Sequence, residues 1–213
     1  MLLLVGLGNP EPRYAGHRHN LGFMALDAIA RGHGFGSWRS RFSSLVCEGT
    51  LGTTKVLLQK PQTYVNRSGY AVAQAMRFYK MPLQDLVLIH DELDLAAGKL
   101  RVKTGGGVAG HNGLRSIAEN LGSRDFRRVR VGIGHPGHKE LVTGHVLGNF
   151  AADDRQWLEP LLDAITTAAP LLASGDDAGF MNKVAVLLRP PKREPEPERK
   201  PKPVAGAESD RSG

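Results

Sequence analysis

The sequence predicts an α/β fold: a single domain with a mostly parallel, twisted central sheet flanked by helices, followed by a disordered C-terminal tail. Short apolar segments of strand type alternate along the chain with segments whose apolar residues recur every three to four positions, which is the element order of α/β folds. The first apolar run, Leu2–Leu7, lacks polar residues, as expected of a strand buried on both faces. After Leu188 the composition changes to proline and charged residues.

The part of the chain before Lys80 is expected to form strands, a hairpin and two helices. In order, these are the strand Leu2–Leu7, a helix over Gly22–Gly32, the hairpin strands Leu45–Leu51 and Thr54–Lys60, and a helix from Ser68 to Tyr79. Gly52 marks the turn of the hairpin. The Ser68 side chain is expected to cap its helix, because the apolar residues after it fall on one helical stripe.

The remainder of the predicted domain alternates strands and helices in the same way. In order, we expect the strands Leu86–Ile89 and Lys99–Lys103, a helix over Leu114–Leu121, the strand Arg128–Ile133, and helices over Asp153–Ala173 and Ala178–Leu188. Gly122 closes the first of these helices with a left-handed residue. Asp153 or Asp154 is expected to cap the long helix, and Pro160 or Pro170 to kink it.

The composition divides the chain into a domain of residues 1–188 and a tail of residues 189–213. The tail holds six of the 13 prolines, with seven basic and five acidic residues. It has too few apolar residues to offset the entropy cost of ordering, so we expect a disordered segment that is partly polyproline II. Such a tail is either a solvated appendage or a weak RNA-contacting arm. The domain keeps +5 of the net charge of +7.

The charge and the single cysteine limit the class of protein. A net charge of +7 and a pI near 9.8 favour an anionic partner, nucleic acid before a membrane surface. One cysteine, Cys47, excludes an internal disulfide and favours a reducing, cytoplasmic compartment, with this thiol buried on a strand. No apolar run approaches the roughly 20 residues that span a bilayer, and the N-terminus lacks the charged start of a signal peptide.

Polar side chains gather in the loops that follow the predicted strands. These residues are, in order, Asn9, His19, Asn66, Asp91, His111 and Asn112. In open α/β sheets ligands bind beyond the carboxyl ends of the strands, so we expect these side chains around one site. A histidine with a carboxylate partner activates water, and amide groups bind the oxygen on which negative charge develops. With either His19 or His111 as the base and Asp91 as its partner, the set predicts hydrolysis of an ester.

Each of these residues also has a plainer interpretation. A single histidine is more often a surface or capping residue than a base, and Asp91 follows a strand, where turn residues are common. Asn9 suits an Asx turn, and Asn112 suits a helix N-cap that could also bind a ligand. The chain has neither the Gly-x-Ser-x-Gly motif of serine hydrolases nor a cysteine spacing typical of zinc sites, so neither a serine triad nor a cysteine-based zinc site is expected.

A glycine segment and two rows of cations leave two other functions open. Gly105–Gly110 fits G-x-G-x-x-G between a strand and a helix, which would suit a nucleotide-binding α/β enzyme, but Asp125 precedes the next strand instead of ending it. The cations alternate along two strands, as Lys99, Arg101 and Lys103 and as Arg128 and Arg130. Such rows favour phosphate binding and would also suit a non-catalytic tRNA- or RNA-binding module.

Six ordered segments of residues 1–188 carry a family resemblance. They are GLGNPEPRY (Gly6–Tyr14), RHNLGF (Arg18–Phe23), KPQTYVNRSG (Lys60–Gly69), HDELDLAAGKLRVKTGGG (His90–Gly107), GHNGLRSI (Gly110–Ile117) and RVRVGIGHP (Arg128–Pro136). Together they resemble bacterial-type peptidyl-tRNA hydrolase. The resemblance implies a monomeric α/β enzyme without metal, cofactor, membrane or protein partner. It would cleave the ester between a peptide and the 3′-terminal ribose of peptidyl-tRNA released from the ribosome, and so recycle tRNA.

The resemblance also implies roles for individual residues. His19 would be the general base, Asp91 would orient it, and Asn9 would help to distinguish a peptide from a free amino group. The implied substrate-binding residues are Asn66 and Asn112 for the peptide backbone, the water or the 3′ end, Tyr14 and Tyr64 as lining, His111 nearby, and Lys103 and Arg130 for tRNA phosphates. The departures from the family pattern are Glu11, His17, Val65 and Val108–Ala109. They remove none of these groups, but they change the expected pocket shape and the stiffness of the glycine segment.

Overall fold

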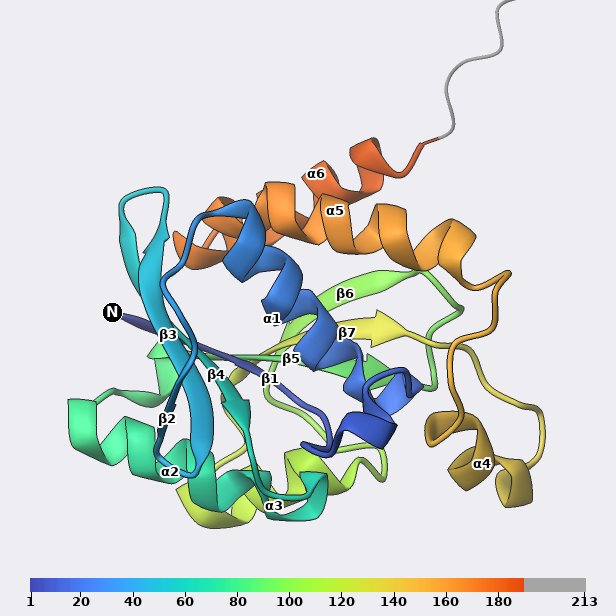
Figure 1. The fold of residues 1–213 in the computed structure, drawn as a ribbon, viewed down its shortest axis with the longest axis horizontal. Helices are drawn as coiled ribbons and strands as arrows, with labels where there is room; N and C mark the ends of the chain where they lie inside the picture. Colours follow the sequence, from blue (N-terminus) through green and yellow to red (C-terminus); the bar gives the residue numbers. More distant parts are fainter. Residues whose placement is uncertain (190–213) are drawn as a thin grey trace, which may run out of the picture.

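Within the described residues, 1–189, the chain forms a seven-stranded mixed sheet with helices on both faces (Figure 1). In the computed structural model the strands are β1 (Leu2–Gly6), β2 (Arg39–Arg41), β3 (Ser44–Leu51), β4 (Thr54–Pro61), β5 (Leu86–Glu92), β6 (Leu100–Thr104) and β7 (Arg127–Gly132). They are ordered β2-β3-β4-β1-β5-β7-β6. The four central strands β4, β1, β5 and β7 are parallel, and the outer strands are antiparallel to their neighbours. The predicted fold class is confirmed, whereas the predicted tail, apart from Arg189, lies outside the described residues.

The helices form two layers. α1 (Leu21–Gly32), α5 (Arg155–Ala173) and α6 (Asp177–Leu187) cover one face, α2 (Ser68–Tyr79) and α3 (Asn112–Leu121) cover the other, and the short α4 (Val142–Val146) lies to one side (Figure 1). Alternate residues of β1 and β5 enter different cores: Leu4 and Ile89 pack with the first layer, and Leu3 and Leu88 with the second. Burial on both faces explains why these strands are continuous apolar runs. None of the helices in residues 1–189 has the length and apolar character to cross a membrane.

The predicted helices and strands are present with small shifts in their bounds. Cys47 is buried on β3, as predicted, and burial raises the pKa of its thiol to about 11. Gly122 has the left-handed backbone expected of a helix cap, with φ of 68°. α5 continues through both Pro160 and Pro170. β2 and α4 were not predicted, because three exposed residues and five residues are too short to show a period.

Two predicted helix caps are wrong. Arg67 occupies the N-cap of α2, and Ser68 is already inside the helix, where its buried hydroxyl has no partner among the described residues. Asp154 stands at the N-cap of α5, but its carboxylate accepts from the Ala151 N–H, which lies before the helix. Both residue types favour N-caps, and both residues stand near the start of a helix. The Asp154 carboxylate bonds outside the helix, and the Ser68 hydroxyl has no partner in the described residues.

The orientation of β6 changes where the glycine segment begins. β6 runs antiparallel to β7, and Thr104 pairs with Arg127 at the start of that strand. Gly105 therefore leaves the sheet at the amino ends of the parallel strands, not at their carboxyl ends as expected. The segment Gly105–Gly110 crosses the sheet face towards the carboxyl ends, where His111 reaches Asp91. The G-x-G-x-x-G pattern thus does not form the strand-to-helix turn of a nucleotide-binding parallel unit.

Two glycines bring α1 into backbone contact with the sheet. A Cβ on Gly6 would lie 2.3 Å from the Gly22 carbonyl oxygen, and a Cβ on Gly22 would lie 2.4 Å from the Ile89 carbonyl oxygen. Neither position has room for a side chain, so the amino end of α1 rests directly on β1 and β5. This contact places the turn before α1, which carries His19, beside the carboxyl end of β5.

Candidate active site

A cleft lies at the carboxyl ends of β1, β4 and β5. One part of it is lined by His19, Asp91, His111 and Asn112 with residues of the glycine segment and α4, and the other part by Asn9, His19, Tyr64, Val65, Asn66 and Asn112. Leu147 also borders both parts. The cleft therefore brings together most of the predicted site residues, whereas Tyr14, Lys103 and Arg130 lie outside its lining.

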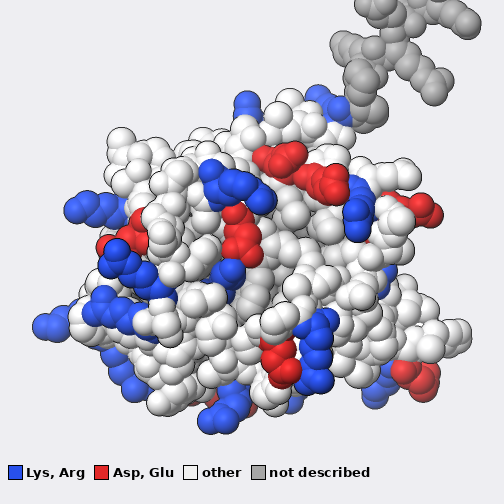
Figure 2. Space-filling view, in the orientation of Figure 1, with Lys and Arg blue, Asp and Glu red and all other residues white. Residues whose placement is uncertain are grey.

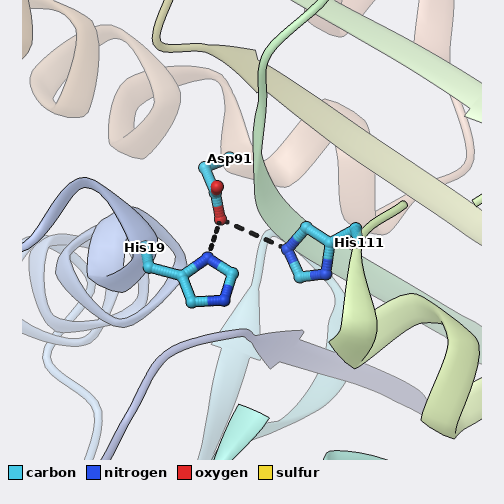
Figure 3. Close-up of side chains that lie close together, drawn as sticks. All are labelled: His19, Asp91 and His111. Carbon is cyan, nitrogen blue, oxygen red and sulfur yellow. Dashed lines mark hydrogen bonds and ion pairs between the residues drawn. The ribbon is translucent and has the colours of Figure 1, made fainter. Parts of the chain in front are cut away.

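His19, Asp91 and His111 converge in this cleft (Figure 3). His19 stands in the turn before α1, Asp91 near the end of β5 and His111 directly before α3. One carboxylate oxygen, Asp91 Oδ1, lies 2.9 Å from His19 Nδ1 and 3.2 Å from His111 Nε2. An ionised carboxylate only accepts hydrogen bonds, so each histidine donates its N–H to Asp91.

The two histidines differ in the role of their second nitrogen. His111 Nδ1 accepts from the backbone N–H groups of Gly113 and Leu114, at 3.1 and 3.4 Å, so His111 and not Asn112 caps α3. Both nitrogens of His111 are therefore occupied inside the protein. Residues 1–189 offer no hydrogen-bond partner to His19 Nε2, and this side chain is 13% exposed. His19 is the histidine whose lone pair is available to take a proton.

Asp91 and His90 are adjacent and buried, and one is charged while the other is neutral. Burial by itself raises the pKa of a carboxyl group, but the charges and hydrogen bonds of His19 and His111 outweigh this and hold the pKa of Asp91 well below its usual range. Burial, together with nearby His111, lowers the pKa of His90 to about 3. At neutral pH, Asp91 is therefore an anion and His90 is a neutral imidazole that donates to the Asp91 carbonyl oxygen at 2.7 Å.

Asn9 is fixed by contacts with two other segments. Its backbone N–H donates to Asn20 Oδ1, and its carbonyl oxygen accepts from Asn20 Nδ2, each at 2.9 Å. Its side-chain oxygen accepts from the Val65 N–H at 3.1 Å, which leaves the amide Nδ2 as a donor for a ligand. Asn20 is buried and was not predicted. The sequence signal for Asn20 was its position directly after His19. From this position, Asn20 holds both Asn9 and the turn that carries His19.

The two predicted tyrosines take different positions. Tyr64 is exposed at the rim of the cleft, and its hydroxyl donates to Glu11, which also pairs with Arg13 at 2.7 Å. Tyr14 is not among the residues that line the cleft, and the Arg13 guanidinium lies 4.7 Å from its ring centroid. Glu11, a departure from the family pattern, is therefore a link between the first loop and the loop after β4.

The predicted cations do not form equivalent rows. Lys103 is exposed. Arg130 is half-buried, and its Nε donates to Glu92 Oε2 at 2.7 Å. Arg128 is only 3% exposed, and its Nη1 donates to the Gly107 carbonyl oxygen at 2.8 Å. Lys103 is thus accessible to an anion and Arg130 is partly exposed but paired with Glu92, whereas Arg128, expected on the same face, is covered by the glycine segment.

Other cations gather away from the cleft. On the face drawn in Figure 2, Lys and Arg side chains are concentrated over β2 and α2. Arg41 of β2 is engaged there, with its guanidinium 4.5 Å from the Phe42 ring centroid and 4.3 Å from that of Phe78. The overall basic charge is therefore not confined to the site.

His19, Asp91 and His111 also have the composition of a metal site. Their ligand atoms lie within 4.8 Å of one another, and imidazole and carboxylate are zinc ligands. A neutral histidine has one donor and one acceptor nitrogen. Because His111 Nδ1 accepts from two N–H groups, Nε2 carries the proton and has no lone pair for a metal. The donor set fits a hydrogen-bonded network better than a metal site, and catalysis without a metal stays a prediction.

α4 supplies an apolar side of the cleft that was not predicted. Val142, Val146 and Leu147 line it. Arg18, the residue before His19, ties this region to the site, because its guanidinium donates to the Asn149 carbonyl oxygen at 2.9 Å and pairs with Asp154 at 2.7 Å. The apolar spacing of Val142 and Val146 was the available signal, but it spans a single helical turn.

Known proteins resemble the chain over nearly all of its described length. A family model described as peptidyl-tRNA hydrolase matches residues 3–194. The peptidyl-tRNA hydrolase of Parvibaculum lavamentivorans is 58% identical over 203 residues, which cover 95% of this chain and 96% of the relative. That of Chelativorans sp. is 58% identical over 89% of this chain and 79% of the relative. A crystal structure of peptidyl-tRNA hydrolase from Acinetobacter baumannii matches with a TM-score of 0.81 and 39% identity, over 86% of this chain and 94% of that one. These matches confirm the resemblance of the six segments, and the chain belongs to the peptidyl-tRNA hydrolase family.

Proposed function

We propose that the protein hydrolyses peptidyl-tRNA at the ester between the peptide and the 3′-terminal ribose, with water as the nucleophile and His19 as the general base. The observation that carries this proposal is the His19–Asp91 pair, in which Nδ1–H binds the carboxylate and Nε2 remains available in the cleft. Family membership supports the substrate. The geometry supports the choice of His19 over His111.

The reaction follows from this arrangement. Nε2 of His19 takes a proton from water as the water oxygen bonds to the ester carbonyl carbon, and the Asp91 carboxylate stabilises the imidazolium that forms. Asn66 and Asn112 line the cleft beside His19, and their amide groups bind the developing oxyanion or the peptide backbone in this proposal. When the carbon–oxygen bond to the ribose breaks, His19 returns the proton to the leaving 3′ oxygen. No protein nucleophile or cofactor is required.

The two ends of the substrate are assigned to different sides of the cleft. On the peptide side, Asn9 offers its Nδ2 donor to a peptide carbonyl, which supports selection of peptidyl-tRNA over free aminoacyl-tRNA. Tyr64 forms the rim there, and Tyr14 acts behind it through the first loop. On the tRNA side, Lys103 and Arg130 contact phosphates near the acceptor end. We further propose a cytoplasmic, monomeric enzyme, which fits the single thiol and this basic surface.

The test compares histidine variants on N-acetylaminoacyl-tRNA and on free aminoacyl-tRNA. His19→Ala should lower kcat by about 10²- to 10⁴-fold, the usual contribution of a general base. His135→Ala is the matched control, because His135 is an exposed histidine after β7 that lies outside the cleft lining; it should retain wild-type kcat. Near wild-type turnover by His19→Ala would reject the assignment of the base.

The same assay separates the alternative functions. A non-catalytic RNA-binding module would bind tRNA and leave the ester intact in every variant. A nucleotide-binding enzyme would be stabilised by NAD or ATP in a thermal unfolding experiment. We expect cleavage of the acylated substrate and no such stabilisation.

A further inference from the structure

Arg128 is a buried cation that the proposed chemistry does not use. It lies on β7 between Leu88 of β5 and Lys103 of β6, and it is 3% exposed. Among the ion pairs of residues 1–189, none involves Arg128. Burial of an arginine without a carboxylate partner is costly, and an apolar side chain of similar length would fill the same space at less cost. Filling of space therefore does not explain why a guanidinium occupies this position.

The guanidinium lies directly beneath the middle of the glycine segment. Its Nη1 donates to the Gly107 carbonyl oxygen at 2.8 Å. A Cβ on Gly106 would lie 3.4 Å from Arg128 Nη2 and 2.9 Å from Lys103 Nζ. The close approach at Gly106 and the hydrogen bond at Gly107 show that the segment rests on this arginine.

Besides this arginine, the described structure holds the segment through Gly105 and through Val108, whose side chain packs against the apolar cluster beneath α2 and α3. The Gly105 N–H donates to the Phe126 carbonyl oxygen at 3.2 Å, and the His111 N–H donates to the Val108 carbonyl oxygen at 2.8 Å. Four of its residues have positive φ: Gly105, Gly106, Ala109 and Gly110. Since the segment crosses the sheet face from the start of β7 to Asp91, its course depends on the contact at its middle. His111 and Asn112 follow it directly.

We propose that Arg128 is a positioning residue that latches the glycine segment to β7 and thereby sets the places of His111 and Asn112 in the cleft. It acts through the Gly107 carbonyl and not through the substrate. The proposal rests on the proposed function for its kinetic test, because His111 shares Asp91 with His19. The competing role is direct contact with a tRNA phosphate, alongside Lys103.

The experiment compares Arg128→Met and Arg128→Lys with Lys103→Met in the full chain. Arg128→Met keeps the length and loses the donors, so backbone hydrogen exchange at His111, whose N–H donates to the Val108 carbonyl oxygen, should accelerate at least tenfold. A misplacement of about 1 Å can cost 10²-fold, so kcat should fall roughly 10- to 100-fold, with the salt dependence of KM unchanged. Lys103→Met should instead raise KM and reduce the salt slope by about one, without faster exchange. Arg128→Lys keeps one donor and should lie between wild type and Arg128→Met in both readouts.

Each possible result of this experiment either supports or rejects the proposal. Wild-type exchange and kcat in Arg128→Met would overturn it. A raised KM with a shallower salt slope at wild-type kcat would also overturn it, in favour of phosphate contact. If Arg128→Met does not fold, Arg128→Lys decides: faster exchange with reduced kcat supports the latch, and wild-type values reject it. Because exchange is measured without substrate, it tests the latch even if the protein proves inactive on peptidyl-tRNA.

Discussion

The wall of the cleft that carries His19 and the wall that carries His111 are attached to the sheet in different ways. His19 precedes a helix that rests on β1 and β5 through the contacts of Gly6 and Gly22. His111 follows a segment that crosses the sheet face on two side-chain contacts, the hydrogen bond from Arg128 and the packing of Val108. Both walls meet at a single oxygen, Asp91 Oδ1.

This difference in attachment suits the two walls to separate tasks. The His19 wall is fixed by close backbone packing and by the paired Asn9–Asn20 hydrogen bonds, which suits a base that has to meet water in one geometry. The His111 wall lies at the end of a segment in which several residues have a left-handed backbone conformation. One of them is Ala109, with φ of 45°, in a backbone region that favours glycine. We therefore expect the His111 wall to be the less rigid of the two.

The largest effect is expected where the walls meet. Asp91→Asn keeps the size of the side chain but removes the charge that accepts from both histidines. In a serine protease triad the corresponding change lowers kcat by about 10⁴-fold; here we expect about 10³-fold, because water, not a buried hydroxyl, is activated. Steady-state kinetics on N-acetylaminoacyl-tRNA measure this. Asp94→Asn, an exposed carboxylate nearby, is the control. Equal kcat in the two variants would remove Asp91 from the mechanism.

The same variant tests the charge state of Asp91 through stability. A carboxyl group whose pKa is lower in the folded than in the unfolded state stabilises the protein above its unfolded pKa of about 4 and loses this contribution as the pH falls below that value. The free energy of unfolding of the wild type should therefore decline more steeply than that of Asp91→Asn below pH about 4. Urea unfolding at several acidic pH values gives the comparison, and parallel curves would contradict the low pKa.

Local chemistry made part of this site predictable. The gathering of His19, Asp91 and Asn9 around one cleft was predicted from polar residue types placed after buried strands, because the parallel central strands bring those loops to one edge. The residue pattern alone left the choice between His19 and His111 open, and only the family resemblance favoured His19, because the physical reason depends on which nitrogen finds a backbone donor. The sequence also did not show that Arg128 is buried, because β6 could have been placed parallel or antiparallel by the same alternating pattern. Asn20 and α4 were missed because neither has a periodic signal.

A smaller effect is expected from loosening the His19 wall. Asn20→Ala leaves the Asn9 backbone N–H and carbonyl without their partner. Loss of these buried hydrogen bonds should lower the free energy of unfolding by about 1–3 kcal/mol. The resulting freedom of Asn9 and His19 should lower kcat about tenfold. Urea denaturation and steady-state kinetics measure the two effects. Asn182→Ala, at an exposed position of α6, is the control, and a variant indistinguishable from it would show that Asn20 does not fix this wall.

The smallest effect is expected from stiffening the other wall, and two neighbouring glycines provide the test. Gly106 has a φ of 86°, and a Cβ there would lie 2.9 Å from Lys103 Nζ, whereas a Cβ on Gly107 would meet nothing within 4 Å. Gly106→Ala should therefore strain the segment by about 1 kcal/mol and displace the lysine, which lowers kcat/KM a few-fold. Gly107→Ala should stay closer to wild type. Equal loss of activity in the two variants would mean that the segment does not tolerate added stiffness at either glycine. The His111 wall would then be as sensitive to substitution as the His19 wall.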